Sequence, residues 1–158
     1  MGSNLQTEHS KRWSSVVIRL ALAIPMVISG VGKVFAVGPK SMGITGFAGF
    51  LTSLGIPFPT VVAWGVGGLE LVGGIALLAG LFVRIAGALI AVNMLVATVL
   101  VHLPNGYPAS DGGIELTLTL TLVALAAVLN GPGPFSLEHS IFDGEVLSSD
   151  SSQSSQAD

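Results

Sequence analysis

Four long apolar segments follow one another along the chain, separated by connections rich in glycine and proline. They cover residues 16–37, 60–82, 85–103 and 114–129. A helix needs about 20 mainly apolar residues to cross a bilayer, and all but the last segment have about that length. Strand-like alternation of apolar and polar positions is absent, which argues against a membrane barrel. The pattern predicts an all-α integral membrane protein built as a four-helix bundle.

The first connection, residues 38–59, is too long to lack structure in so small a protein. Phe47, Phe50, Leu51 and Leu54 lie at positions i, i+3, i+4 and i+7, which is one face of a helix. This helix is too short to cross a membrane, so we predict an interfacial or re-entrant segment. It would either simply cover the bundle or act as a lid over a ligand site.

The composition agrees with a membrane protein and excludes several classes of function. Hydrophobic residues make up 51% of the 158 positions and charged residues only 9%, whereas soluble domains contain about 25% charged residues. So much apolar side chain excludes disorder over the whole chain. The sequence contains no cysteine, which excludes disulfides, thiol nucleophiles and cysteine-ligated clusters. No basic patch is dense enough to predict a nucleic-acid partner.

The membrane domain is expected to cover residues 16–139. It lies between an N-terminal flank, 1–15, and an acidic tail, 140–158, whose polar composition predicts disorder. The first apolar segment is not expected to be a removed signal peptide. Arg19 interrupts it, and no clean small-residue cleavage site follows.

The orientation in the membrane is predicted from the lysine and arginine residues beside the spans. Lys11 and Arg12 precede the first segment, and Arg84 lies between the second and the third. Positive residues favour the cytoplasmic side of a membrane. We therefore expect a multi-pass protein of the plasma membrane with both termini in the cytoplasm.

Ionisable residues within or beside the spans are the main candidates for function, because a charge inside a bilayer costs several kcal/mol. They are Arg19, Lys33, Glu70, Arg84, His102 and Glu115. On a helix, Glu70 shares one stripe with the small residues Ala63, Gly67 and Gly74. Small residues allow a second helix to approach closely, so these charges are expected to face the interior of the bundle.

Depth in the membrane divides these candidates into groups. Arg19 and Arg84 are expected near the cytoplasmic surface, and Glu70 lies roughly 15 Å inside its span. The remaining three residues are expected near the outer surface. We predict that His102 and Glu115 form the catalytic pair, because a carboxylate favours a protonated imidazole and lets it transfer protons. The other four candidates would form a ligand-binding or charge network.

Structural roles are the alternatives for the same residues. Arg19, Arg84 and Lys33 would extend to the membrane interfaces, and His102 with Glu115 would clamp two helices together. Glu70 would be a buried neutral acid or the partner of Arg19. Hydrogen bonds between helices are expected from Asn93, Thr117, Thr119 and Thr121. No metal site is predicted, because His102 and Glu115 provide only two ligands.

Several short motifs occur in a fixed order along the chain. They are Arg19 with Gly30-x-x-Lys33, Phe50-Leu-x-x-Leu-Gly-Ile-Pro57, Glu70 with Gly73-Gly74, Gly80-Leu-x-x-Arg84, His102-x-Pro-x-Gly106, Gly113-x-Glu115 and Gly131-Pro-Gly-x-x-Ser-Leu137. Their order and spacing resemble the DoxX family of small four-helix membrane proteins over most of residues 16–139. The resemblance implies the four-helix fold.

The resemblance also implies a function, because the family is associated with terminal quinol oxidase and with thiosulfate:quinone oxidoreductase. It implies a quinone as cofactor and a membrane or peripheral redox protein as partner. Other relatives act as membrane chaperones or cargo-handling factors. The absence of a thiol argues against thiosulfate oxidation by this chain alone.

Two functions of different classes follow. In the first, the chain is an oxidoreductase subunit in which Lys33, His102 and Glu115 bind a quinone and handle protons. In the second, it is a non-enzymatic scaffold or assembly factor whose charges dock partner helices. The gathering of His and Glu at one depth favours the redox function, although sequence leaves enzymatic activity open. Transport is less favoured, because a pore would require an oligomer and the repeat of many transporters is absent.

Overall fold

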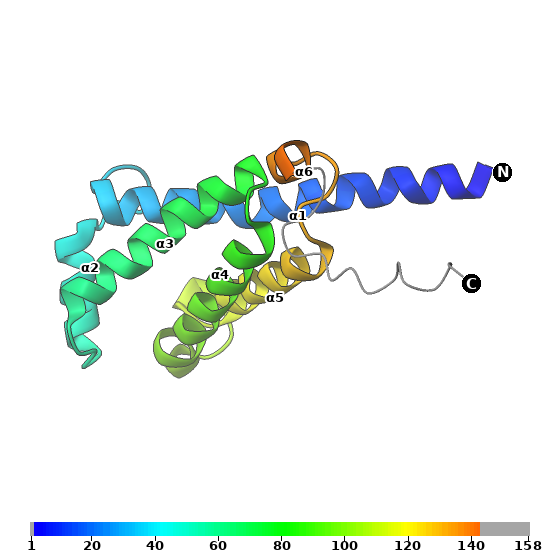
Figure 1. Ribbon diagram of the computed structural model, residues 1–158. Coiled ribbons are helices and arrows are strands. Elements are labelled where there is room, and N and C mark those ends of the chain that lie inside the picture. Colours follow the sequence, from blue (N-terminus) through cyan, green and yellow to red (C-terminus); the bar gives the residue numbers. More distant parts are fainter. Residues whose placement is uncertain (1, 143–158) are drawn as a thin grey trace, which may run out of the picture.

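The described part of the chain is helical and contains no strand, which confirms the predicted all-α fold (Figure 1). The computed structural model describes the backbone of residues 2–142 and the side chains of residues 13–141. Its α-helices are α1 (Gly2–Phe35), α2 (Gly43–Ser53), α3 (Pro59–Ala79), α4 (Val83–Ala97), α5 (Glu115–Asn130) and α6 (Leu137–Phe142). A single π-helical turn, Thr98–His102, continues α4.

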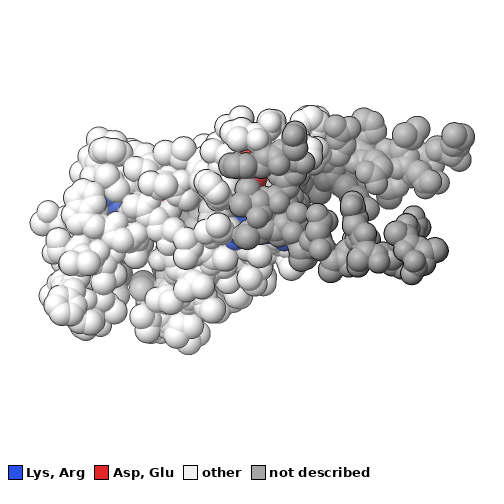
Figure 2. Space-filling view, viewed as in Figure 1, with Lys and Arg blue, Asp and Glu red and all other residues white. Residues whose placement is uncertain are grey.

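Among the described residues, the stretches Trp13–Phe35, Pro59–Ala79 and Val83–Asn105 are long and apolar enough to cross a membrane. The fourth apolar helix, α5, is shorter, with 16 residues. Large apolar side chains such as Val72 are exposed on the outer surfaces of these helices. Figure 2 shows one face of the molecule that is almost free of charged atoms. Lipid accommodates apolar surface of this extent, and the protein is embedded in a membrane.

The helix boundaries differ from the sequence prediction at both ends of the chain. Helix α1 begins at Gly2, so residues 2–15 of the expected N-terminal flank, 1–15, continue the first span as helix. The short helix predicted in the first connection is present as α2. Residues 140–142 of the expected tail belong to α6, and residues 143–158 lie outside the described part of the chain.

Glycines allow α1 and α3 to pack against each other without intervening side chains. A Cβ atom at Gly30 of α1 would collide with the backbone of Leu71, and one at Gly74 of α3 would collide with the backbone of Val27. The two helices run antiparallel and side by side (Figure 1). The structure therefore confirms that small residues set the close approach of these two helices.

Two groups of buried apolar side chains hold the helices together. The larger group joins α1, α3, α4 and α5 and includes the fully buried Leu22, Leu77 and Ile90. The smaller group joins α2 to the beginning of α3 and is centred on Phe47 and Ala63. The main bundle and the α2–α3 hairpin therefore have separate cores.

The beginning of α3 extends beyond the end of α1. Lys33 lies two residues before the end of α1, whereas Glu70 lies eleven residues after the start of α3, and these two side chains are in contact. At 1.5 Å per residue the overhang is roughly 13 Å. Helix α2 packs against this overhang and closes its apolar face. This offset brings a residue from the middle of one helix beside the end of another.

We predict that Gly30→Ala lowers the free energy of unfolding by about 1–3 kcal/mol, because the added methyl group forces α1 away from α3. Gly68→Ala is the matched control, because a Cβ at this position of α3 has no neighbour within 4 Å. The control is expected to be neutral or slightly stabilising, since alanine favours helix. Thermal and denaturant unfolding in detergent micelles would measure both variants, and equal stabilities would contradict the prediction.

Candidate functional site

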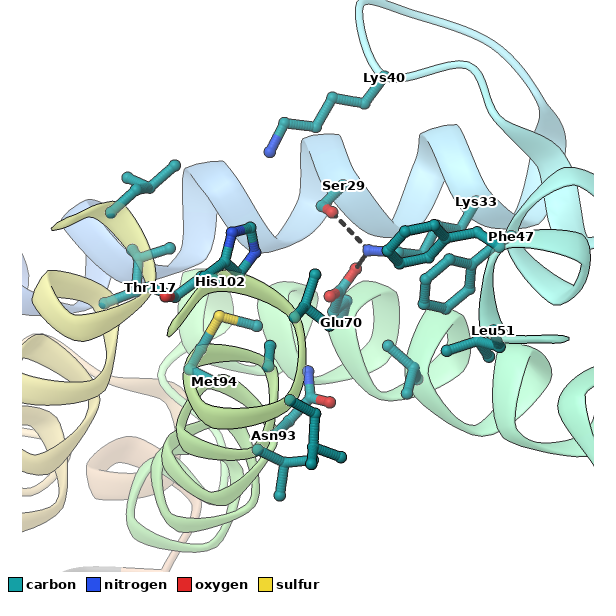
Figure 3. Close-up of a pocket in the computed structure, with 18 of the residues that line it drawn as sticks. Ser29, Lys33, Lys40, Phe47, Leu51, Glu70, Asn93, Met94, His102 and Thr117 are labelled. Carbon is teal, nitrogen blue, oxygen red and sulfur yellow. Dashed lines mark hydrogen bonds and ion pairs between the residues drawn. The ribbon is translucent and has the colours of Figure 1, made fainter. Parts of the chain in front are cut away.

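A cavity of about 310 Å³ lies between the α2–α3 hairpin and the C-terminal end of α4 (Figure 3). Its walls are mostly apolar and come from five elements. The apolar lining includes Met26, Phe47, Phe50, Leu51, Leu54, Val62, Val66, Met94, Val96, Leu100, Val101, Leu116 and Leu120. Small-molecule sites are generally apolar cavities of about 300–1,000 Å³ with a few polar groups, and this cavity has that character.

An ion pair between Lys33 and Glu70 forms the polar centre of the cavity (Figure 3). Lys33 Nζ lies 2.5 Å from Glu70 Oε2, and it also donates a hydrogen bond of 2.8 Å to Ser29 Oγ. The ring of Phe47 lies 5.0 Å from Lys33 Nζ, which adds a cation–π contact. Glu70 is 3% exposed and Lys33 is 15% exposed. The two charges therefore compensate each other away from bulk solvent.

The pairing corrects two expectations about Glu70. The partner of Glu70 is Lys33 rather than Arg19. Glu70 and Lys33 also lie at the same depth in the bundle, whereas the sequence predicted different depths for them. The overhang of α3 beyond α1 explains the difference, because depth was counted as though all spans started at the same level. Gly67 packs against the aliphatic stem of Lys33 and leaves room for it beside α3.

His102 and Glu115 bind different backbone groups rather than each other. His102 lies at the end of the π-helical turn and lines the cavity, and its Nδ1 is 2.6 Å from the carbonyl oxygen of Gly112. Glu115 accepts a hydrogen bond of 3.0 Å from the backbone N–H of Ala109 and is not among the cavity-lining residues. His102 thus lines the same cavity as Lys33 and Glu70, whereas Glu115 braces the connection that contains Gly112.

The hydrogen bond of His102 fixes its tautomer. A carbonyl oxygen only accepts, so Nδ1 carries the hydrogen and donates it to Gly112. In the neutral ring Nε2 is then an acceptor, and it becomes a donor only when the imidazole is protonated. His102 can therefore donate a proton from Nε2 and return to a neutral form that its backbone partner already stabilises.

Asn93 contributes a buried donor that has no partner. Its Nδ2 atom is shielded from solvent and makes no hydrogen bond in the described structure, and the residue lines the cavity. In Figure 3 the side-chain amide points toward the region of Glu70. An unsatisfied buried donor costs about 1–3 kcal/mol, and a ligand oxygen in the cavity would satisfy it.

Arg19 and Arg84 lie at the opposite end of the bundle and do not line the cavity. Arg19 is 5% exposed and donates to the carbonyl oxygens of Pro132, at 3.2 Å, and Phe135, at 2.7 Å. Arg84 donates to the carbonyl oxygen of Val128 at 2.8 Å. Arg19 therefore fixes the segment after α5, and Arg84 bonds the last turns of α5 itself, so neither residue extends the charge network of the cavity.

Sequence reasoning missed several residues of the site. Ser29 lies one helical turn before Lys33, and this i, i+4 spacing is the signal that would have identified it. Asn93 was interpreted as a hydrogen-bonding residue between helices. Lys40, at the mouth of the cavity, and Phe47 were not connected with Lys33. The positions of Lys40 and Phe47 beside Lys33 depend on how the α1–α2 connection folds, so sequence spacing alone could not predict them.

The fold and the site define a helical membrane protein with an ion pair between two of its spans and a cavity beside that pair. The family model described as DoxX matches residues 14–103, and the chain belongs to the DoxX family. An uncharacterised protein of Haemophilus influenzae is 33% identical over 129 residues, which cover 79% of this chain and 88% of that protein.

A second relative, from Bacillus subtilis, bears the name "Putative oxidoreductase CatD". It is 26% identical over 131 residues, which cover 83% of this chain and 89% of the relative. No solved structure matches the chain. The similarity to both relatives extends over most of their length and agrees with a family fold that includes the cavity-lining helices.

We predict that Lys33→Met lowers the free energy of unfolding by about 3–5 kcal/mol, because it leaves the buried Glu70 carboxylate without a partner. The double variant Lys33→Met/Glu70→Leu is expected to recover most of this loss, since it replaces both charges by apolar side chains of similar size. Unfolding of the single and double variants in detergent micelles would give the coupling energy. Simple addition of the two single losses would contradict a compensating pair.

Proposed function

We propose that this DoxX protein is the quinone-binding subunit of a membrane redox complex. The observation that carries the proposal is the cavity, whose apolar walls surround a polar centre made by Lys33, Glu70, His102 and Asn93. A quinone matches this distribution of apolar and polar groups, because it has an apolar ring and tail and two carbonyl oxygens that accept hydrogen bonds. The volume of about 310 Å³ suits one ring system.

The cavity walls also support a ligand that arrives from the lipid. Phe50 and Leu54 on one side, and Val96 and Leu100 on the other, line the cavity and are exposed at its edge. Val96 and Leu100 belong to a stretch that crosses the membrane. The edge between α2 and α4 is therefore apolar, and the tail of a lipid-soluble ligand would lie along it.

Three donors would recognise the carbonyl oxygens. Asn93 Nδ2 is buried and without a partner, Lys33 Nζ carries a positive charge, and protonated His102 would donate from Nε2. A bound quinone would supply the electron- and proton-accepting chemistry. Glu70 would hold Lys33 Nζ in position between turnovers through their ion pair. These roles are those of general acid catalysis inside a low-dielectric site.

Electrons must reach the site from a second protein. Full reduction of a quinone ring adds two electrons and two protons, and the chain's own residues offer protons only. The sequence contains no cysteine for an iron–sulfur cluster, and the described residues contain no group of three His, Cys, Asp or Glu side chains that would hold a metal. We therefore assign electron donation to a membrane or peripheral redox protein.

The setting proposed for this complex is the plasma membrane. The positive residues Lys11, Arg12 and Arg84 support a cytoplasmic position for both termini. The cavity end of the bundle would then face outward. The name of the Bacillus subtilis relative supports an oxidoreductase function in general terms and says nothing about the electron acceptor.

The decisive variant removes the proton-carrying pair without leaving a buried charge. Lys33→Met/Glu70→Leu is expected to lower quinone reduction about 10²–10⁴-fold, the range typical of lost general acid–base catalysis. The measurement is quinone reduction by native membranes that contain the protein and its partner. Asp111→Asn is the matched control, because Asp111 is an exposed acid that does not line the cavity, and it is expected to keep full turnover.

Gentle extraction followed by analysis of bound lipids provides a second readout. The unaltered protein and Asp111→Asn should retain quinone, whereas Asn93→Leu and the double variant should lose it. Unchanged turnover and unchanged quinone content in the folded double variant would overturn the proposal. A protein partner that co-purifies in the absence of any quinone would favour the alternative function of an assembly factor.

A further inference from the structure

A second cavity lies beneath the connection between α1 and α2. It measures about 560 Å³ and is lined by Ser29, Lys33, Pro39, Lys40, Ser41, Met42, Phe47 and Phe50. We call it the vestibule. Residues 39–42 of its lining are exposed and follow the end of the first span, so the vestibule opens where the chain leaves the membrane.

The vestibule and the apolar cavity share one wall. Ser29, Lys33, Lys40, Phe47 and Phe50 line both spaces, whereas Glu70 and His102 line the apolar cavity and not the vestibule. Lys33 Nζ is bonded to Ser29 on this wall and to Glu70 beyond it. The ion pair is therefore reached from the vestibule through Lys33 and Ser29.

The two spaces open to different surroundings. The edge of the apolar cavity at Phe50, Leu54 and Leu100 is hydrophobic, and the exposed lysine of that cavity, Lys40, is shared with the vestibule. The vestibule contains the hydroxyl groups of Ser29 and Ser41 and the ammonium groups of Lys33 and Lys40. A space of this size with several polar partners can hold water, which needs two to four such groups.

We propose that the vestibule is the route by which water, and with it protons, reaches the Lys33–Glu70 pair, from the side of the α1–α2 connection alone. Its use during turnover rests on the proposed quinone function. A proton that Lys33 gives to a ligand oxygen would be replaced by one from water in the vestibule, and no electron moves in this step. Ser29 is then a positioning residue, because it holds Lys33 Nζ at the shared wall.

The positive charge of the vestibule favours the entry of anions over cations. Its lining contains two lysines and, among the described residues, no acidic side chain. Lys40 is exposed at the mouth, so anions are attracted into the vestibule and cations are repelled. A unit charge at contact distance in water changes a local concentration about fivefold.

Single cysteines test this route directly, because the sequence contains no cysteine of its own. The probe is an anionic, membrane-impermeant methanethiosulfonate, which forms a mixed disulfide with a cysteine thiolate and releases methanesulfinate. In proteoliposomes, the labelled fraction of the exposed Ser41→Cys measures how many molecules have their α1–α2 connection on the outside of the vesicle. Ser29→Cys should reach the same final labelled fraction. The charge of the vestibule raises the local concentration of the anionic probe and lowers that of a cationic analogue about fivefold each. Relative to their rates with a free thiol in solution, the anionic probe should therefore be favoured about 25-fold, and Lys40→Met should reduce this ratio.

Two further cysteines are the controls. Ala23→Cys lies fully buried on the same helix as Ser29, and Val72→Cys lies exposed on the apolar outer surface of α3. Both are expected to stay unlabelled. If Ser29→Cys does not fold, Phe50→Cys reports on the same wall, since Phe50 lines both spaces and is partly exposed.

The result separates this proposal from the proposed function. Unlabelled Ser29→Cys or Phe50→Cys beside labelled Ser41→Cys would overturn the route, whatever the redox activity. Labelling from the opposite face would overturn it as well. Labelling as expected in a protein that neither binds nor reduces quinone would support the route and overturn the quinone function alone.

Discussion

The ion pair between Lys33 and Glu70 is the constraint on which the arrangement of the cavity end of the bundle depends. Either charge alone would be costly within a span, so the two must meet. They come from different depths in sequence, and they meet only because α3 is displaced along α1. Glycines at the contact allow the displacement, and α2 covers the part of α3 that it exposes. The position of α2, the helix offset and the cavity therefore all go together with this one ion pair.

Charged side chains have different partners at the two ends of the bundle. At the end opposite the cavity, Arg19 donates to backbone carbonyls, and Glu138 accepts a hydrogen bond of 3.3 Å from the backbone N–H of Val83. These bonds join the segment after α5 to α1 and to the start of α4. At the cavity end, Lys33 and His102 line the cavity. The candidate site therefore lies at the cavity end, and the bonds of Arg19 and Glu138 stabilise the opposite end.

The sequence was sufficient to predict the helical class and the short helix in the first connection. The length of an apolar segment and its helical periodicity are local properties, so they can be read from the sequence without knowledge of the fold. The pairing of Glu70 with Lys33 was not predictable, because it depends on the offset between two helices. The separation of His102 from Glu115 was missed for a similar reason. Both residues flank one connection, but each side chain bonds a backbone group of that connection instead of the other side chain. His102 bonds the carbonyl of Gly112, and Glu115 bonds the N–H of Ala109.

The π-helical turn that ends in His102 carries one more residue than an α-helical turn would need. Such a turn has the form of a single inserted residue accommodated without breaking the helix. The same residues wound as a regular α-helix would rotate everything beyond the turn by about 100° relative to α4. The imidazole would then turn away from the cavity, while the apolar character of the span stayed the same. A relative with a regular α-helical turn here would have the same hydropathy profile and a different site.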